Sequence, residues 1–129
     1  MTRLTIRIDF EDAEGFGPGK ARLLELIEEH GSIRSAAAAM NMSYRHAWLL
    51  LQAVENTFGA PVMTTATGGA KGGGAKLNEL GKSIIAHYRA IELQASKAAA
   101  PELSELIKTA AQSPITDERA GKRRERAPR

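Results

Sequence analysis

Residues 31–58, GSIRSAAAAMNMSYRHAWLLLQAVENTF, determine the fold that we predict for this 129-residue chain. Apolar residues recur every three or four positions in both halves of the stretch, as they do on one face of a helix. The halves are separated at Asn41-Met42, and the alanines of the first half allow a second helix to cross it closely. The stretch therefore predicts two short helices joined by a tight turn, a helix-turn-helix.

Capping residues mark the ends of these helices. Ser32 and Ser43 each precede a helical pattern, and a serine hydroxyl in that place accepts a hydrogen bond from a free N–H of the first turn. Asn41 tolerates the left-handed backbone that ends a helix. A further helix is expected over residues 18–30, ahead of the pair, and the second helix of the pair should run to Phe58.

Segments with strand character flank the helices. Residues 3–10 alternate apolar and polar side chains, which predicts a strand with one buried face. Residues 62–67 are rich in β-branched side chains, and the glycine-rich stretch 68–74 separates them from a short return at 75–77. We expect this second region to be a β-hairpin, the wing that distinguishes a winged helix-turn-helix from a plain one.

A long helix should follow the hairpin. Its apolar residues recur in steps of three and four, and we expect this stripe to mediate dimerisation through Leu80, Ile84, Tyr88, Ile91 and Ala95. Pro101 should open a separate short helix, and the charged residues that follow this helix are typical of disorder. The predicted chain is mainly α with a small β-hairpin: a winged helix-turn-helix with its long C-terminal helix over 1–98, a short helix over 99–112 and a disordered tail over 113–129.

Positive charge is concentrated in two regions. The chain has 18 basic and 15 acidic residues, a net charge of +3. Residues 117–129 hold six basic and three acidic residues, and residues 31–91 hold six basic and two acidic ones, so the second region has a local balance of +4. Such an excess suits a surface that binds a polyanion, although ordinary solvated surfaces show it too.

Catalytic and metal-binding functions have little support. The chain has no cysteine, and His30, His46 and His87 are isolated, so we expect no metal, no cofactor and no enzyme activity. Gly81-Lys82-Ser83 resembles the end of a phosphate-binding loop, but Lys76 stands where that motif needs its leading glycine. The sequence has no long apolar run and no secretory signal, so we expect a cytoplasmic protein without a membrane partner.

The outward face of the second helix of the pair carries the candidate DNA contacts. Its N-terminal turn is where recognition helices meet base edges in the major groove. Arg45 can span guanine O6 and N7, and Gln52 can pair with adenine. Trp48 fits the margin of the core equally well, and the wing tip fits an unliganded hairpin. The predicted DNA-binding residues are Ser32, Arg34, Ser43, Tyr44, Arg45, His46, Trp48, Gln52, Thr67, Lys71 and Lys76.

Four motifs, in order and spacing, resemble the N-terminal DNA-binding domain of ModE-type molybdate-responsive regulators, which is related to that of LysR-type regulators. They are Gly17-Pro18-Gly19-Lys20, Gly31-Ser32-Ile33, Met42-Ser43-Tyr44-Arg45-His46-Ala47-Trp48 and Thr65-Ala66-Thr67-Gly68-Gly69. The resemblance, over about residues 4–91, implies a dimeric transcription factor that reads DNA with the helix at 43–58, assisted by the wing. ModE proteins also carry C-terminal molybdate-binding domains. Residues 99–129 offer only a short helix and a charged tail, so we expect no molybdate binding.

Three hypotheses follow from these patterns. The first is a sequence-specific, homodimeric regulator that binds double-stranded DNA. The second is a winged-helix module that docks onto protein, because a fold does not determine a function. The third, a protein that handles an oxyanion or a nucleotide, rests on the glycine-rich stretch alone.

Overall fold

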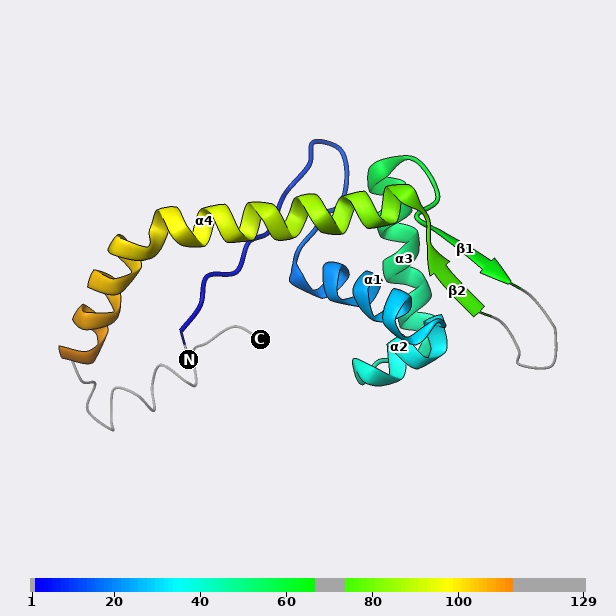
Figure 1. Ribbon diagram of the computed structural model, residues 1–129, viewed down its shortest axis with the longest axis horizontal. Coiled ribbons are helices and arrows are strands. Elements are labelled where there is room, and N and C mark those ends of the chain that lie inside the picture. The colour runs from blue at the N-terminus through cyan, green and yellow to red at the C-terminus, as the bar shows by residue number, and fades with distance from the viewer. Residues whose placement is uncertain (1, 67–73, 113–129) are drawn as a thin grey trace. The chain divides into compact units, whose positions relative to one another are not determined.

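A computed structural model of the chain describes residues 2–66 and 74–112 (Figure 1). The order of elements is α1 (Pro18–His30), α2 (Ile33–Ala39), α3 (Tyr44–Phe58), β1 (Met63–Ala66), β2 (Gly74–Leu77) and α4 (Glu79–Gln112). One compact unit comprises Arg3–Gln94, and a second comprises the first two residues with Ala95–Arg129. The mainly helical winged fold with a small hairpin and a long C-terminal helix is confirmed.

The predicted capping residues end and begin the first three helices. The hydroxyl oxygens of Ser32 and Ser43 accept hydrogen bonds of 3.0 Å from the backbone N–H groups of Ser35 and His46. Asn41 has φ +57°, and Gly31, which follows α1, has φ +77°. Because these bonds and angles involve neighbours within a few residues, the boundaries of α1, α2 and α3 follow the sequence pattern closely.

The core lies where α1, α2 and α3 meet. The buried face of α3 consists of Ala47, Leu51, Ala53 and Val54, and the small side chains of Ala36 and Ala37 in α2 are completely or almost completely buried. Small residues at this crossing let the two helix backbones approach, as predicted. Leu50 and Phe58, also predicted to face inward, are half-buried at the edge of the core.

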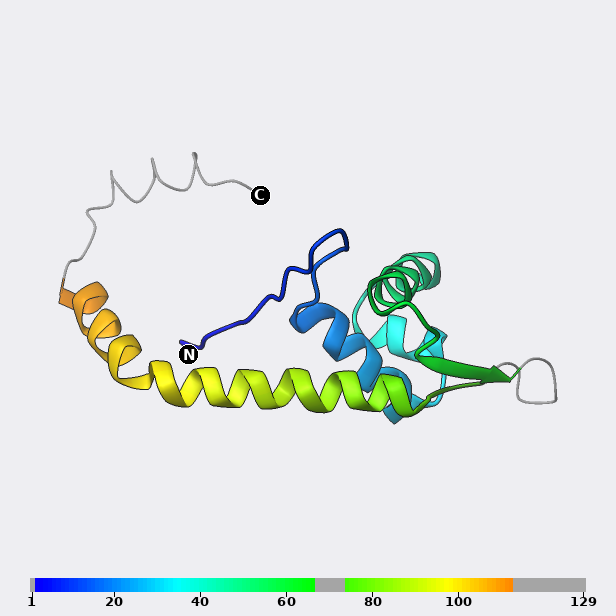
Figure 2. The same ribbon diagram turned by 90° about the horizontal axis from the view of Figure 1, so that it is seen from above.

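The hairpin pairs β1 and β2 in antiparallel register, with Met63 opposite Leu77 and Ala66 opposite Gly74. In both views it extends away from the helices (Figures 1 and 2). A carboxylate oxygen of Glu55 in α3 accepts a 3.0 Å hydrogen bond from the backbone N–H of Val62, which ties the start of the hairpin to α3. Residues 67–73 lie outside the described residues.

The predicted strand at residues 3–10 is wrong. Ile8 and Phe16 form an isolated antiparallel bridge, and no strand is assigned over residues 2–16. A strand needs a neighbouring strand along its length, and this segment has none in the described chain. It packs along α4 instead, where the Tyr88 hydroxyl donates a 2.6 Å hydrogen bond to the Ile6 carbonyl. The alternation holds in part, since Leu4, Ile6 and Ile8 are half-buried between exposed neighbours, whereas Phe10 is 37% exposed.

The start of α4 is anchored on the loop that follows α3. The Asn78 side-chain oxygen accepts from the N–H of Gly81 at 2.9 Å, and its amide nitrogen donates to the Pro61 carbonyl at 2.8 Å. The new helix predicted to begin at Pro101 is wrong, since α4 continues through this proline to Gln112. A proline lacks one helical hydrogen bond, but the three alanines that precede it are the strongest helix formers.

Candidate nucleic-acid interface

The N-terminal part of α3 presents a continuous exposed face. Tyr44 is 40% exposed, and Arg45, His46 and Gln52 are also exposed, as predicted. Leu49, which is 51% exposed, lies one turn after Arg45 and three residues before Gln52. Leu49 is not among the predicted contacts because it is apolar and sits next to the apolar face, although its spacing from Arg45 places it on the outward face.

Trp48 lies between this face and the core. It is half-buried and packs against the core residues, so the placement at the core margin is the one that the structure shows. Its ring meets the Tyr44 ring edge to face, with centroids 6.2 Å apart. Contact between its exposed part and DNA stays a prediction.

Arg34 connects α2 to this aromatic pair. Its guanidinium carbon lies 4.4 Å from the centre of the Tyr44 ring, within the range of a cation–π interaction. Arg34, Tyr44 and Trp48 therefore form one stack that spans the two helices of the helix-turn-helix. The stack limits the freedom of an arginine that would otherwise be a mobile side chain. Sequence spacing gave no indication of it, because Arg34 and Tyr44 lie in different helices.

The two predicted serines have a structural role in the first instance. Ser32 and Ser43 accept the N-terminal hydrogen bonds of α2 and α3, which uses lone pairs of their oxygens and leaves the hydroxyl hydrogens available. Both hydroxyls can therefore cap a helix and donate to a phosphate. The capping is observed, and the phosphate contact stays a prediction.

The described part of the wing offers one cation. Lys76 is exposed on β2 and lies opposite Thr64, which is also exposed. The other predicted wing residues, Thr67 and Lys71, lie outside the described residues. Lys76 is therefore the wing residue whose placement the structure supports.

The basic residues of the central region divide into two groups. Within residues 2–66 and 74–112, no ion pair involves Arg34, Arg45 or Lys76. Lys82 lies 4.0 Å from carboxylate oxygens of both Glu28 and Glu79. The positive charge predicted for this region is thus available on the helix-turn-helix and the wing, and partly neutralised at the start of α4.

Arg89 belongs to the neutralised group. Its guanidinium makes a two-point contact with the Glu25 carboxylate, at 2.8 and 2.9 Å, and a third bond to Glu92. Hydrogen bonding to Arg89 lowers the pKa of Glu25, and the same carboxylates raise the pKa of Arg89. This network joins α4 to α1, which lie side by side in both views (Figures 1 and 2). Arg89 is a structural residue here.

The stripe predicted for dimerisation is only partly exposed. Ile84 and Tyr88 are 7% and 2% exposed because α4 packs them into the core of its own chain, where Tyr88 also meets Phe16 edge to face. Leu80 is half-buried, and Ile91 is 41% exposed. An apolar groove of about 370 Å³ runs beside them; its lining includes Phe10, Phe58, Leu80, His87 and Ile91. Ala95 belongs to the second unit, where it is half-buried.

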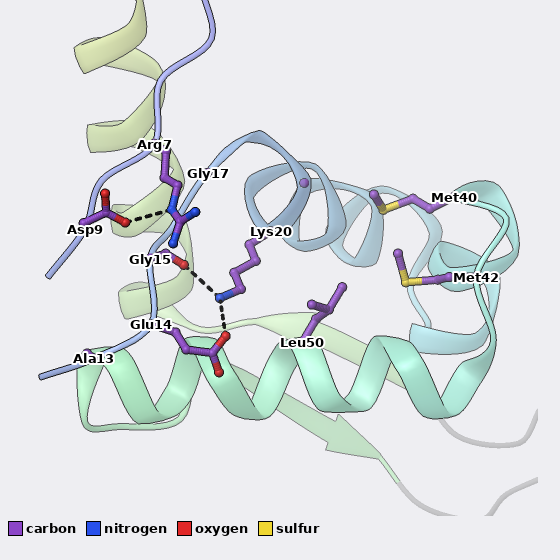
Figure 3. Close-up of a pocket in the computed structure, with 11 residues that line it drawn as sticks. Arg7, Asp9, Ala13, Glu14, Gly15, Gly17, Lys20, Met40, Met42 and Leu50 are labelled. Carbon is purple, nitrogen blue, oxygen red and sulfur yellow. Dashed lines mark hydrogen bonds and ion pairs between the residues drawn. The ribbon is translucent and has the colours of Figure 1, made fainter. Parts of the chain in front are cut away.

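A second hollow, of about 470 Å³, lies between the N-terminal loop and the helix-turn-helix (Figure 3). Met40, Met42 and Leu50 form its apolar wall. Lys20 reaches across it to donate to the Gly15 carbonyl at 2.8 Å and approaches Glu14 at 3.5 Å, while Arg7 pairs with Asp9 at 2.8 Å. Both cations at its mouth are matched by carboxylates, so the arrangement attaches the loop to α1 and lacks the excess charge of an anion site.

The described residues contain neither a metal site nor a membrane-spanning helix. No three histidine or acidic side chains there come together in a way that would hold a metal ion. No helix in the described ranges combines the length and the apolar character needed to cross a membrane.

Known proteins share this architecture and part of this sequence. The family described as bacterial regulatory helix-turn-helix protein, lysR family, matches residues 19–82. The chain is 36% identical to the molybdenum transport protein ModE of Azotobacter vinelandii over 95 residues, which cover 72% of this chain and 35% of that protein. It is 44% identical to the molybdenum-pterin-binding protein MopB of Rhodobacter capsulatus over 81 residues, covering 63% and 30%.

The matched part is therefore about a third of the length of these curated relatives. Among solved structures, the chain is similar to the protein in the CbnR_DBD–DNA complex, with a TM-score of 0.53 and 17% identity, over 68% of this chain and 95% of that one. At that identity the likeness shows a shared fold.

Proposed function

We propose, from the premise that residues 19–82 form a helix-turn-helix domain of the lysR family and of the ModE type, that this chain is a transcriptional regulator that binds double-stranded DNA. The observation that carries the proposal is the exposed face of α3. Arg45, without an ion pair among the described residues, stands in its first turn, and Arg34 is stacked on Tyr44 beside it. Binding to DNA would give these cations the negative partners that the described chain does not supply.

Sequence would be read by the face that contains Arg45, Leu49 and Gln52. Arg45 presents two donors to guanine, Gln52 pairs with adenine, and the exposed Leu49 between them can contact a thymine methyl group. Arg34 and Lys76 would bind phosphates on either side and so position the domain on the duplex. The caps at Ser32 and Ser43 add hydroxyl donors for the backbone.

We further propose that the regulator is a homodimer. Two recognition helices bind half-sites one helical turn apart only when they are held at a fixed separation. The apolar groove beside α4 supports this, because Phe10 and Ile91 remain 37% and 41% exposed next to it. A second copy of the chain would cover both. Since Ile84 and Tyr88 are used in the core, the contact would rest on Leu80, Ile91 and Phe10.

The first experiment compares the affinity for the promoter region of its own gene with that for a random duplex of equal length, at matched salt. A specific regulator should prefer its site by at least about a thousandfold. Arg45→Ala should cost about 1 to 3 kcal/mol on the specific site and much less on the random duplex. Arg3→Ala, which removes one exposed charge outside the proposed interface, serves as the control. Equal affinity for both duplexes would contradict the proposal of specific reading.

Docking onto another protein is the second candidate, and the exposed Leu49 and Tyr44 favour it. Apolar and aromatic side chains without an excess of negative charge suit a protein partner as well as DNA. This candidate gains support if no duplex binds at low salt while Leu49→Ala abolishes recovery of a partner. Salt-dependent binding to duplex DNA would argue against the protein-docking candidate.

A further inference from the structure

Strand β2 has two edges, and β1 covers only one of them. Successive N–H groups along a strand alternate between its edges, so those of Ala75 and Leu77 point away from β1. Both residues are almost fully buried, with exposures of 7% and 4%. Unpaired N–H groups in such a position are costly, so this edge needs acceptors from elsewhere in the chain.

The end of α1 supplies both acceptors. The Gly31 carbonyl, just past α1, accepts a 2.8 Å hydrogen bond from the N–H of Ala75. The Glu28 carboxylate accepts a 2.9 Å bond from the N–H of Leu77, 49 residues away in sequence. One backbone oxygen and one side-chain oxygen thus take the place of a third strand along β2.

Lys76 lies between the two anchored residues. Its side chain is exposed on the other face of β2, so the direction in which it points depends on how β2 is held against α1. Gly31 anchors β2 through backbone that the α1–α2 turn already holds. Glu28 does so through a side chain that a point substitution can remove.

We propose that Glu28 is a positioning residue for the wing: its carboxylate holds β2, and with it Lys76, in a set orientation relative to the recognition helix α3. The effect on DNA rests on the function proposed above, whereas the effect on the orientation of the wing does not. The bond to Leu77 carries the role, and the contact with Lys82 contributes little. Lys82 is 4.0 Å away and half-exposed, and such surface pairs add little stability.

Three substitutions of Glu28 test whether the length or the charge of its side chain holds the wing. Glu28→Gln keeps an acceptor oxygen at the same reach without the charge. Glu28→Asp keeps the charge but is one methylene shorter, and Glu28→Ala removes both. The proposal predicts that Gln preserves the orientation of the wing and that Asp and Ala both lose it. The neighbouring exposed Glu29→Ala is the matched control.

The orientation can be measured without DNA. Because the chain has no cysteine, Asn56→Cys in α3 and Thr64→Cys in β1 allow two spin labels to be attached at exposed positions. Electron–electron double resonance then gives the distribution of distances between them. We expect the distribution to widen at least twofold in the Ala and Asp variants and to stay unchanged in the Gln and Glu29→Ala variants. An unchanged width in the Ala variant, or a Gln variant as wide as Ala, would overturn the proposal.

Duplex binding supplies the second measurement. Loss of one phosphate contact lowers the salt slope by about 0.9, which is about a fivefold weaker affinity at 0.15 M salt relative to 1 M. If Glu28 acts by orienting Lys76, Glu28→Ala should weaken binding by up to that factor in the native chain and by much less in a Lys76→Ala background. Equal weakening in both backgrounds would contradict the proposal. Absence of all duplex binding would refute the proposed function and leave the distance measurement to decide the role of Glu28.

Discussion

Gly81 stands where α4 passes closest to the loop that follows α3, and replacing it by alanine should destabilise the fold. A Cβ atom at this position would overlap the backbone carbonyl oxygen of Val62 and would lie 3.2 Å from a methyl carbon of Leu77. The Val62 carbonyl also accepts the 3.0 Å hydrogen bond from the N–H of Asn78. The clash is therefore with an atom that cannot move without breaking the junction between the hairpin and α4.

The magnitude is set by three contributions. Alanine gains about 1 kcal/mol over glycine in a helix interior. Forcing an extra methyl into a packed site costs about 1 to 3 kcal/mol, and a weakened hydrogen bond costs about 0.5 to 1.5 kcal/mol more. The net expectation is a loss of about 2 kcal/mol in the free energy of unfolding, which would lower Tm by about 10 °C for a domain of this size.

Gly19 provides the matched control. It also lies in a helix, α1, but no atom lies within 4 Å of the place where its Cβ would be. Gly19→Ala should therefore leave stability unchanged or raise it by up to about 1 kcal/mol. Urea and thermal unfolding, followed by circular dichroism, measure both variants. The expected clash at Gly81 would be refuted if Gly81→Ala were as stable as the native chain, or if both substitutions changed the free energy of unfolding by the same amount.

Three further outcomes are expected. Ile91→Asp should convert a dimer into a monomer in sedimentation at micromolar concentration, whereas the same change at the neighbouring exposed Ala90 should do so less, and a native chain that is already monomeric would contradict the dimer. Because hydrogen bonding to Arg89 lowers the pKa of Glu25, its contribution to stability is complete above about pH 4.5 and is lost as the pH falls through the lower value in the folded state. The stability advantage of the native chain over Glu25→Gln should therefore vanish in acid, and an advantage that persists at pH 2 would oppose this assignment. Molybdate should change neither the heat of titration nor the affinity of the 129-residue chain for DNA, and a calorimetric signal would overturn that expectation.

The candidate site was predictable where its features are local. The exposure of Tyr44, Arg45 and Gln52 follows from the phase of the apolar face of α3, which any regular helix must respect. Leu49 has the same phase, but its apolar character made it look like a core residue, so its exposure was not predicted. The stack of Arg34 on Tyr44 required the crossing of α2 and α3 to be known. No spacing rule connects residues in separate helices.

The sequence by itself determined the ends of α1, α2 and α3 and the presence of the wing. Caps such as Ser32 and Ser43, and the left-handed residue Asn41, act on backbone groups within a few positions, so their effect does not depend on the rest of the fold. The hairpin was likewise marked by β-branched residues at 62–67, followed by glycines and a short return at 75–77. At these positions, interactions between residues that are close together in the sequence determine the local conformation.

Only the tertiary structure decided which partner each apolar or polar group would find. Residues 3–10 alternate like a strand but have no neighbouring strand among the described residues, and the Tyr88 side chain, expected at a dimer contact, lies in the core beside Phe16. Nothing in the sequence pattern connects Glu28 with Leu77, which lies 49 residues away, and only the fold brings the two together. Burial and hydrogen bonding stabilise an apolar or polar group with whichever surface packs against it. Which surface that is depends on the packing of all the helices together.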